Sequence, residues 1–227
     1  MKLSLNNITY GNPTLKQKEF LSKTCLVSDL YPKLKDFPCP ENESDSTKQE
    51  LNELMEFAKD IQLDDNEKFK KRFIFYDKNL FQAISNSFKT EKADIDQLIK
   101  DIDEDITPLI VRLKYNYQRP RPYQLAQYYK LKLFPFSSTS AHSPSYPSGH
   151  TVQAYVMLTV IGNLMPEFYE KAKKMIEDVA YSRCYIGVHY PTDNDFAYQV
   201  AQEILKHPDF AKKYGIWWNN FSYCTIS

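Results

Sequence analysis

The sequence lacks the features that mark several broad classes of protein. Its longest apolar run, residues 154–165, is interrupted by Thr159, Gly162 and Asn163, whereas a membrane span needs roughly 20 apolar residues. No sign of charge is in excess, because 29 basic side chains balance 29 acidic ones. The balance argues against a nucleic-acid binder or a membrane-surface binder.

Paired cysteines and a leader segment are also missing. The cysteines are Cys25, Cys39, Cys184 and Cys224, with no CxxC spacing, so free thiols in a reducing compartment are expected. Residues 1–20 contain no apolar core followed by a cleavage site. We therefore expect a cytoplasmic protein. If a signal peptide has been removed, the alternative is a periplasmic or secreted protein, in which Cys25 and Cys39 are candidates for a disulfide.

Strand-like alternation is nearly absent, and no internal repeat is visible. Apolar residues instead recur at spacings of three and four, which is typical of helices packed on one face. These patterns predict helices over residues 46–63, 67–88, 93–117, 148–165, 166–185 and 191–205. The sequence therefore predicts an all-α, single-domain helical bundle over residues 46–227. Residues 1–45, broken by prolines, are predicted to form an irregular arm packed on the core.

Glycine is rare, with five in the chain, and one of them lies in the segment Pro147-Ser148-Gly149-His150 at a predicted helix start. The first backbone N–H groups of a helix are unpaired and attract anions, and a glycine lets an anion approach its amide. The Ser148 hydroxyl can cap the helix or bind the anion. His150 could hand a proton to a leaving oxygen. Taken alone, the segment is better explained as a helix start with a core histidine.

Two cations stand at the end of the predicted helix 93–117. Lys114 and Arg121 are seven residues apart, which in helical geometry places them on the same side. Pro120 and Pro122 end that helix and stiffen the chain that follows. Surface cations are also favoured at the C-terminus of a helix by its dipole, and this simpler explanation is preferred for the segment alone.

A third segment combines a cation, a histidine and an acid. Arg183 offers a planar fork of donors suited to an oxyanion. Asp193 follows His189 by four residues, so its carboxylate could hold one imidazole nitrogen and leave the other as a nucleophile or base. Asp195 is a competing partner for the histidine. The simpler alternative is a surface ion pair of Arg183 beside a buried histidine.

Together the three segments supply the groups needed to bind a tetrahedral oxyanion and to attack it. No metal is expected, because an Asp193-x-Asp195 pair alone is weak evidence for a metal site.

Written as patterns, the segments are K-x6-RP from Lys114, PSGH from Pro147 and SR-x5-H-x3-D from Ser182. The chain thereby resembles the phosphatidic acid phosphatase type 2 / vanadium haloperoxidase superfamily. With its length and lack of membrane spans, it looks most like the soluble class A (non-specific) acid phosphatases. The signature covers about 80 residues, and three blocks in the right order are highly specific.

The resemblance implies a metal-independent phosphomonoester hydrolase, which could also transfer phosphate to other alcohols. It implies His189 as the nucleophile that forms a phosphohistidine, Asp193 as its orienting acid and His150 as the general acid. The implied phosphate-binding residues are Lys114, Arg121, Ser148, Gly149 and Arg183. No cofactor is implied, and vanadate is expected as an inhibitor.

Two features of the sequence leave alternatives open. Arg112 and Arg119 fit a second basic-x6-RP spacing, although the lysine favours the Lys114 register. His142 lies shortly before PSGH, and this extra histidine resembles the pattern of haloperoxidase-like members of the superfamily. Vanadate would be the cofactor of a protein with that activity. That activity is the second hypothesis, and a non-enzymatic phosphate-binding scaffold is the third.

The substrate cannot be read from the sequence beyond a small phosphorylated molecule. Residues 123–146 are candidates for a specificity wall; their aromatic side chains, which packing explains equally well, are Tyr123, Tyr128, Tyr129, Phe134 and Phe136. The sequence is compatible with a homo-oligomer. The resemblance to acid phosphatases implies a periplasmic location, since those relatives are largely periplasmic.

Overall fold

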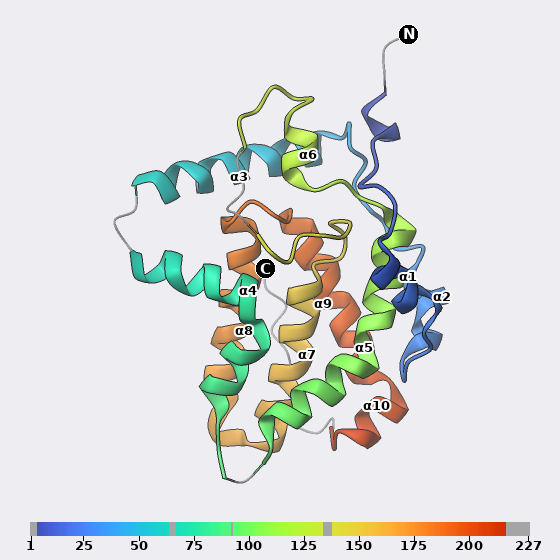
Figure 1. The fold of residues 1–227 in the computed structure, drawn as a ribbon, viewed down its shortest axis with the longest axis vertical. Helices are drawn as coiled ribbons and strands as arrows, with labels where there is room; N and C mark the ends of the chain where they lie inside the picture. Colours follow the sequence, from blue (N-terminus) through green and yellow to red (C-terminus); the bar gives the residue numbers. More distant parts are fainter. Residues whose placement is uncertain (1–3, 64–66, 92, 134–137, 217–227) are drawn as a thin grey trace.

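The computed structural model describes residues 4–63, 67–91, 93–133 and 138–216. Within these residues all regular secondary structure is helical, which confirms the predicted all-α class (Figure 1). No helix in this part of the chain is long and apolar enough to cross a membrane. Cys25, Cys39 and Cys184 are free thiols, so the alternative disulfide is not formed, and Cys224 lies outside the described residues.

The predicted helices are all present, with ends within a few residues of those expected. They are α3 (Asp45–Leu63), α4 (Glu67–Phe88), α5 (Ile95–Tyr117), α7 (Gly149–Leu164), α8 (Tyr169–Tyr185) and α9 (Pro191–Lys206). The shorter elements α6 (Pro122–Ala126), α10 (Pro208–Lys213) and η3 (Pro166–Phe168) were not predicted separately.

The N-terminal arm is more regular than its prolines suggested. It contains η1 (Leu5–Asn7), α1 (Leu15–Ser22), η2 (Ser28–Leu30) and α2 (Tyr31–Leu34). Helix α1 starts at a capping box, in which Thr14 and Gln17 each bond the other's backbone N–H. Helix α2 has a proline in its first turn, where proline is tolerated. The prolines therefore separate short helices instead of preventing them.

Helix α7 forms the centre of the bundle. Its side chains are buried almost without interruption from Thr151 to Gly162, as expected for a helix that is apolar on all sides. It packs mainly against α8 and α9 and also contacts α4 and α5 (Figure 1).

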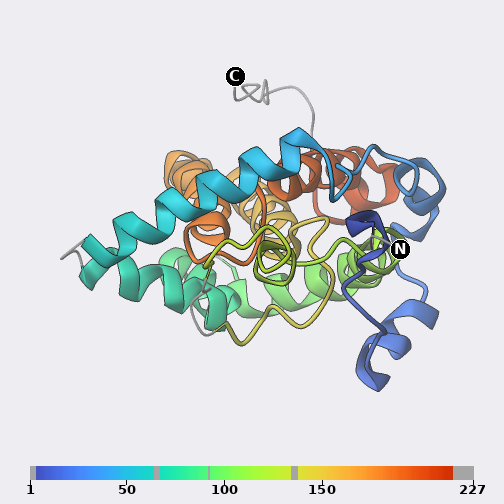
Figure 2. The same cartoon turned by 90° about the horizontal axis from the view of Figure 1, so that it is seen from above.

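The connections that carry the three sequence motifs meet at one end of the bundle. Helix α5 ends where Gln118 takes a left-handed conformation with φ of 52°, and Pro120 and Pro122 carry the chain into α6. The N-termini of α7 and α9 lie at the same end (Figure 1). Helix α3 runs across this end, as the view from above also shows (Figure 2).

The central position of α7 generates a stability prediction. Leu158→Ala should lower the free energy of unfolding by about 2–5 kcal/mol, because Leu158 is fully buried and its truncation leaves a cavity. Leu164→Ala, on the same helix but 46% exposed, should change it by less than about 1 kcal/mol. Urea titrations of both variants test this, and equal losses would contradict the central role of α7.

Candidate active site

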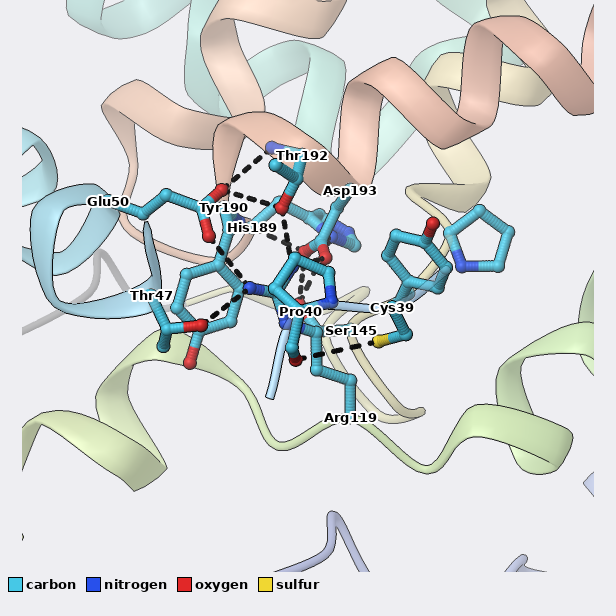
Figure 3. A network of polar contacts seen from close by, with 12 residues as sticks. Cys39, Pro40, Thr47, Glu50, Arg119, Ser145, His189, Tyr190, Thr192 and Asp193 are labelled. Atoms are coloured by element: carbon cyan, nitrogen blue, oxygen red, sulfur yellow. Dashed lines mark hydrogen bonds and ion pairs between the residues drawn. The ribbon is translucent and has the colours of Figure 1, made fainter. Parts of the chain in front are cut away.

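His189 is held by a hydrogen bond to the acid four residues after it. Gly187 takes φ of 75° after the end of α8, and the backbone N–H groups of Val188 and His189 both donate to the Arg183 carbonyl at 3.2 Å. His189 Nδ1 then lies 2.9 Å from Asp193 Oδ2, in the first turn of α9 (Figure 3). A carboxylate accepts, so the ring proton is on Nδ1 and the lone pair is on Nε2.

Arg121 faces that lone pair. Its guanidinium lies 2.8 Å from His189 Nε2 and donates to the carbonyls of Val188 and Ser143, both at 2.8 Å. Burial of the ring and the neighbouring charge of Arg121 hold the pKa of His189 well below its ordinary value. His189 is therefore neutral at ordinary pH, with an unprotonated Nε2 whose position is set by Arg121.

Lys114 anchors the loop that precedes α7. Its ammonium group donates to the carbonyls of Pro144 and Pro147 at 2.8 and 2.6 Å. Burial and the charge of Arg121 lower the pKa of Lys114 far below its usual range. Neither Lys114 nor Arg121 has a carboxylate within ion-pair distance among the residues that the structure describes. Two buried basic groups therefore lie beside His189 without a counter-ion among the described residues, and an anion there would stabilise the charged form of both.

The start of α7 is bonded to Asp193 and lies against the Lys114 side chain. Ser148 is the N-cap residue, but its hydroxyl bonds Thr151 Oγ1 at 2.8 Å instead of capping a backbone N–H. Its own N–H donates to the Asp193 carbonyl at 3.0 Å. A Cβ at Gly149 would lie 3.3 Å from Cε of Lys114. A side chain at position 149 would therefore press on the Lys114 stem by a few tenths of an ångström, a contact that the sequence alone did not indicate.

Arg183 and His150 meet at a buried acid on α4. Arg183 donates to Asp77 Oδ1 at 2.8 Å and to Ser140 Oγ at 2.9 Å. The Nε2 of half-buried His150 lies 3.3 Å from the carbonyl of Asp77 and donates to it. Burial and the charge of Arg183 lower the pKa of His150 to about 3, so its ring is neutral here. The structure thus connects every predicted site residue within one region.

Asp77 is a site residue that the sequence analysis missed. Burial raises its pKa, but Arg183 and the hydroxyls of Ser138 and Ser140 outweigh this and hold the pKa at about 2. The signal was present, because Asp77 lies on the buried stripe that Phe73 and Leu80 define along α4. An acid on a buried stripe needs a partner.

The second spacing considered for the basic motif does not place both arginines at the site. Arg112 lies over the ring of Tyr31 at 4.3 Å. Arg119 bonds Asp193 at 2.7 Å on the side away from His189 Nε2. The Lys114 register is therefore the one that reaches the predicted nucleophile.

The proposed specificity wall is only partly described. Tyr129 donates to the Asn42 carbonyl at 2.6 Å and Tyr128 is 51% exposed, while Phe134 and Phe136 lie outside the described residues. The Tyr129 hydroxyl thus bonds a backbone carbonyl within the protein.

Comparisons with known proteins show what this chain is similar to. Residues 106–198 match the family model of the PAP2 superfamily, a range that includes Lys114 through Asp193. A curated non-specific acid phosphatase from Providencia stuartii is 30% identical over 131 residues, which cover 55% of this chain and 52% of that protein. The alignment thus spans about half the length of this curated relative.

A solved structure resembles the fold. The transmembrane PAP2 type phosphatidylglycerolphosphate phosphatase from Bacillus subtilis aligns with a TM-score of 0.53 and 17% identity, covering 88% of this chain and 98% of that one. At this identity the likeness concerns the fold alone.

The contact between Gly149 and Lys114 generates a prediction about anion affinity. Gly149→Ala should weaken the binding of inorganic phosphate by about tenfold or more, because the new Cβ displaces the Lys114 stem. Gly162→Ala is the matched control on the same helix, since its Cβ would meet only ordinary contacts of 3.5 Å or more. Calorimetric titration with phosphate and thermal unfolding of both variants provide the test. Equal phosphate affinity in the two variants would contradict the prediction.

Proposed function

We propose that the protein is a phosphatase of the PAP2 superfamily, whose family model matches residues 106–198, and that it hydrolyses phosphomonoesters through a phosphohistidine on His189. The observation that best supports this is a pair of buried basic side chains, Lys114 and Arg121, that lie beside His189 Nε2 and have no carboxylate partner within the described part of the chain. A phosphoryl group supplies the missing negative charge and an electrophilic atom at the same place. The name of the Providencia stuartii relative is consistent with this activity.

The reaction has two displacements at phosphorus. In the first, the Nε2 lone pair of His189 forms the N–P bond while the P–O bond to the alcohol breaks. The Arg121 guanidinium leaves Nε2 and donates to a phosphoryl oxygen. Asp193 continues to accept the hydrogen bond from Nδ1–H and stabilises the positive charge that develops on the ring. In the second, water attacks phosphorus and gives a proton to the neutral His150, the N–P bond breaks with its electron pair returning to His189 Nε2, and inorganic phosphate leaves. Another alcohol in place of water gives phosphotransfer.

Protonation of the leaving alkoxide is assigned to His150. The pKa of His150 is about 3 without a ligand, mainly through burial and the charge of Arg183. A phosphoryl dianion bound by Arg183 offsets that charge and raises the pKa of His150, so the ring can carry the proton it donates. A pocket of about 620 Å³, lined by His150, Lys16, Lys78 and both polar and apolar side chains, adjoins this histidine. We assign the leaving group to this pocket.

Arg183 adds a free donor to the site. Its Nε is buried and has no hydrogen-bond partner among the residues that the structure describes, and a buried unpaired donor carries a desolvation cost. A phosphoryl oxygen is a suitable acceptor for it. The same residues would hold vanadate, a phosphate analogue that we expect to inhibit.

The function is tested with a generic aryl phosphate in the presence of a chelator. We expect hydrolysis that vanadate inhibits and that His189→Ala abolishes. His207→Ala is a control, because His207 bonds Asp29, an acid of the N-terminal arm, and should keep the wild-type rate. Bromide oxidation with vanadate and peroxide, in the absence of any hydrolysis, would establish the haloperoxidase activity instead. Unchanged hydrolysis by His189→Ala would remove His189 as the nucleophile.

The role of His150 is tested with a series of leaving groups. His150→Ala should slow esters of poor leaving groups by about 10²–10⁴-fold and esters of good ones much less, because only the former need the proton. Steady-state rates for a series of aryl and alkyl phosphates measure this. A uniform loss across the series would show that His150 does not act as the acid.

A further inference from the structure

The two carboxylate oxygens of Asp193 have different partners. Oδ2 accepts from His189 Nδ1 at 2.9 Å, from the Tyr190 N–H at 3.0 Å and from the Ser145 hydroxyl. Oδ1 accepts from a guanidinium N–H of Arg119 at 2.7 Å (Figure 3). Asp193 is fully buried and the Arg119 side chain is 1% exposed. Arg119 therefore reaches His189 only through the orienting acid.

Arg119 is itself fixed from a second element. It donates to Glu50 Oε2 on α3 at 2.8 Å and to Thr192 Oγ1 at 2.8 Å, and its guanidinium lies 3.8 Å from the ring centre of Tyr190. The other oxygen of Glu50 accepts from the N–H and the hydroxyl of Thr192 at 2.8 and 2.6 Å. Figure 3 shows these groups converging between α3 and the N-terminus of α9. Glu50 thus binds both Arg119 and the first turn of the helix that carries Asp193.

The chain places two arginines on opposite sides of the nucleophile. Arg119 and Arg121 are separated only by Pro120, and Arg121 contacts His189 Nε2 while Arg119 contacts the acid on the Nδ1 side. The backbone carbonyl of Arg119 also accepts from the N–H of Ser145 at 2.9 Å. A shift of this short connection would therefore displace both ends of the imidazole.

We propose that Arg119 and Glu50 are positioning residues for the nucleophile, with Arg119 keeping Asp193 ionised and in place and Glu50 fixing Arg119. Their effect on turnover rests on the proposed phosphatase function. Their effect on the proton affinity of the His189–Asp193 pair does not, and can be measured in a protein that turns nothing over.

The sign of that effect follows from the charges that face the pair. They come from several neighbouring elements: Lys114, Arg119 with its partner Glu50, Arg121, and the side chains of Cys39, Tyr146, Cys184 and Tyr190. Burial raises the pKa of Asp193, and Arg119 is the largest of the influences that lower it. Without Arg119 the pair takes up a proton at higher pH. Because the nucleophile must be unprotonated, the acidic limb of the activity profile moves to higher pH with it.

The kinetic experiment compares Arg119→Gln, Arg119→Lys and Glu50→Gln with Arg112→Gln, a control that removes an arginine of α5 stacked on Tyr31. Arg119→Gln should lower kcat by about 10–100-fold, with KM little changed because Arg119 does not touch the substrate. The acidic limb of the pH–activity profile of Arg119→Gln should move to higher pH by about one unit or more. Arg119→Lys restores the charge and should return the limb toward the wild-type position.

Glu50→Gln tests the direction of the pH shift from the opposite charge. It removes a negative charge near Asp193 and should lower kcat without moving the acidic limb to higher pH. Arg112→Gln should match the wild type. Variants of Arg119 whose pH profiles keep the wild-type shape, with losses that follow the folded fraction alone, would overturn the proposal.

Nitrogen NMR of histidine-labelled protein separates this proposal from the proposed function. With His189→Ala to assign the signal, the wild type should show the Nδ1–H form of His189 from neutral pH into the acid range. The His189–Asp193 pair of Arg119→Gln should bind a proton at higher pH, and Arg119→Met, which also removes the charge, serves as the test if Arg119→Gln does not fold. Identical titrations in the wild type and in these uncharged variants of Arg119 would overturn the positioning role even if hydrolysis is observed. Absence of hydrolysis with shifted titrations would overturn only the phosphatase function.

Discussion

The hydrogen bond from His189 Nδ1 to Asp193 Oδ2 is the interaction on which the rest of the site depends. It fixes the ring proton on one nitrogen and leaves Nε2 directed at Arg121. The fold provides the geometry: Gly187 takes a left-handed conformation after the end of α8, and α9 begins with Pro191 in its first turn, so His189 and Asp193 face each other. Changes at either helix end therefore act on the proposed nucleophile.

Charge is the second constraint. Asp193 and Asp77 each have an arginine partner, whereas the partners of Lys114 and Arg121 among the described residues are carbonyls and the imidazole. Arg121 keeps its charge for an incoming anion, and such an anion would favour the charged form of Lys114. Burial and the charge of Arg121 lower the pKa of Lys114, and burial and the charge of Arg183 lower the pKa of Arg121 to about 10, which is repulsion among buried basic groups. An oxyanion at this place would relieve it.

The sequence predicted the long helices because their apolar spacing is strong. It also predicted that the motif residues act together, and the structure brings them together because they lie at helix ends on one side of the bundle. It did not predict the partners on other elements. Asp77 and Glu50 lie on helical faces that are otherwise buried, so their burial could be suspected from spacing. Their partners, Arg183 and Arg119, are about 106 and 69 residues away, and local patterns carry no information about such pairs. The need for glycine at position 149 likewise depends on where Lys114 passes.

The central claim is that His189 forms a covalent bond to phosphorus. Its most direct test is rapid mixing with an aryl phosphate, quenching under alkaline conditions that preserve N–P bonds, and peptide mass spectrometry. The account predicts a phosphoryl group on the peptide that contains His189, located on that residue by fragmentation and absent from His189→Ala. Rapid turnover with no phosphorylated peptide, or a phosphoryl group on a different residue, would contradict it.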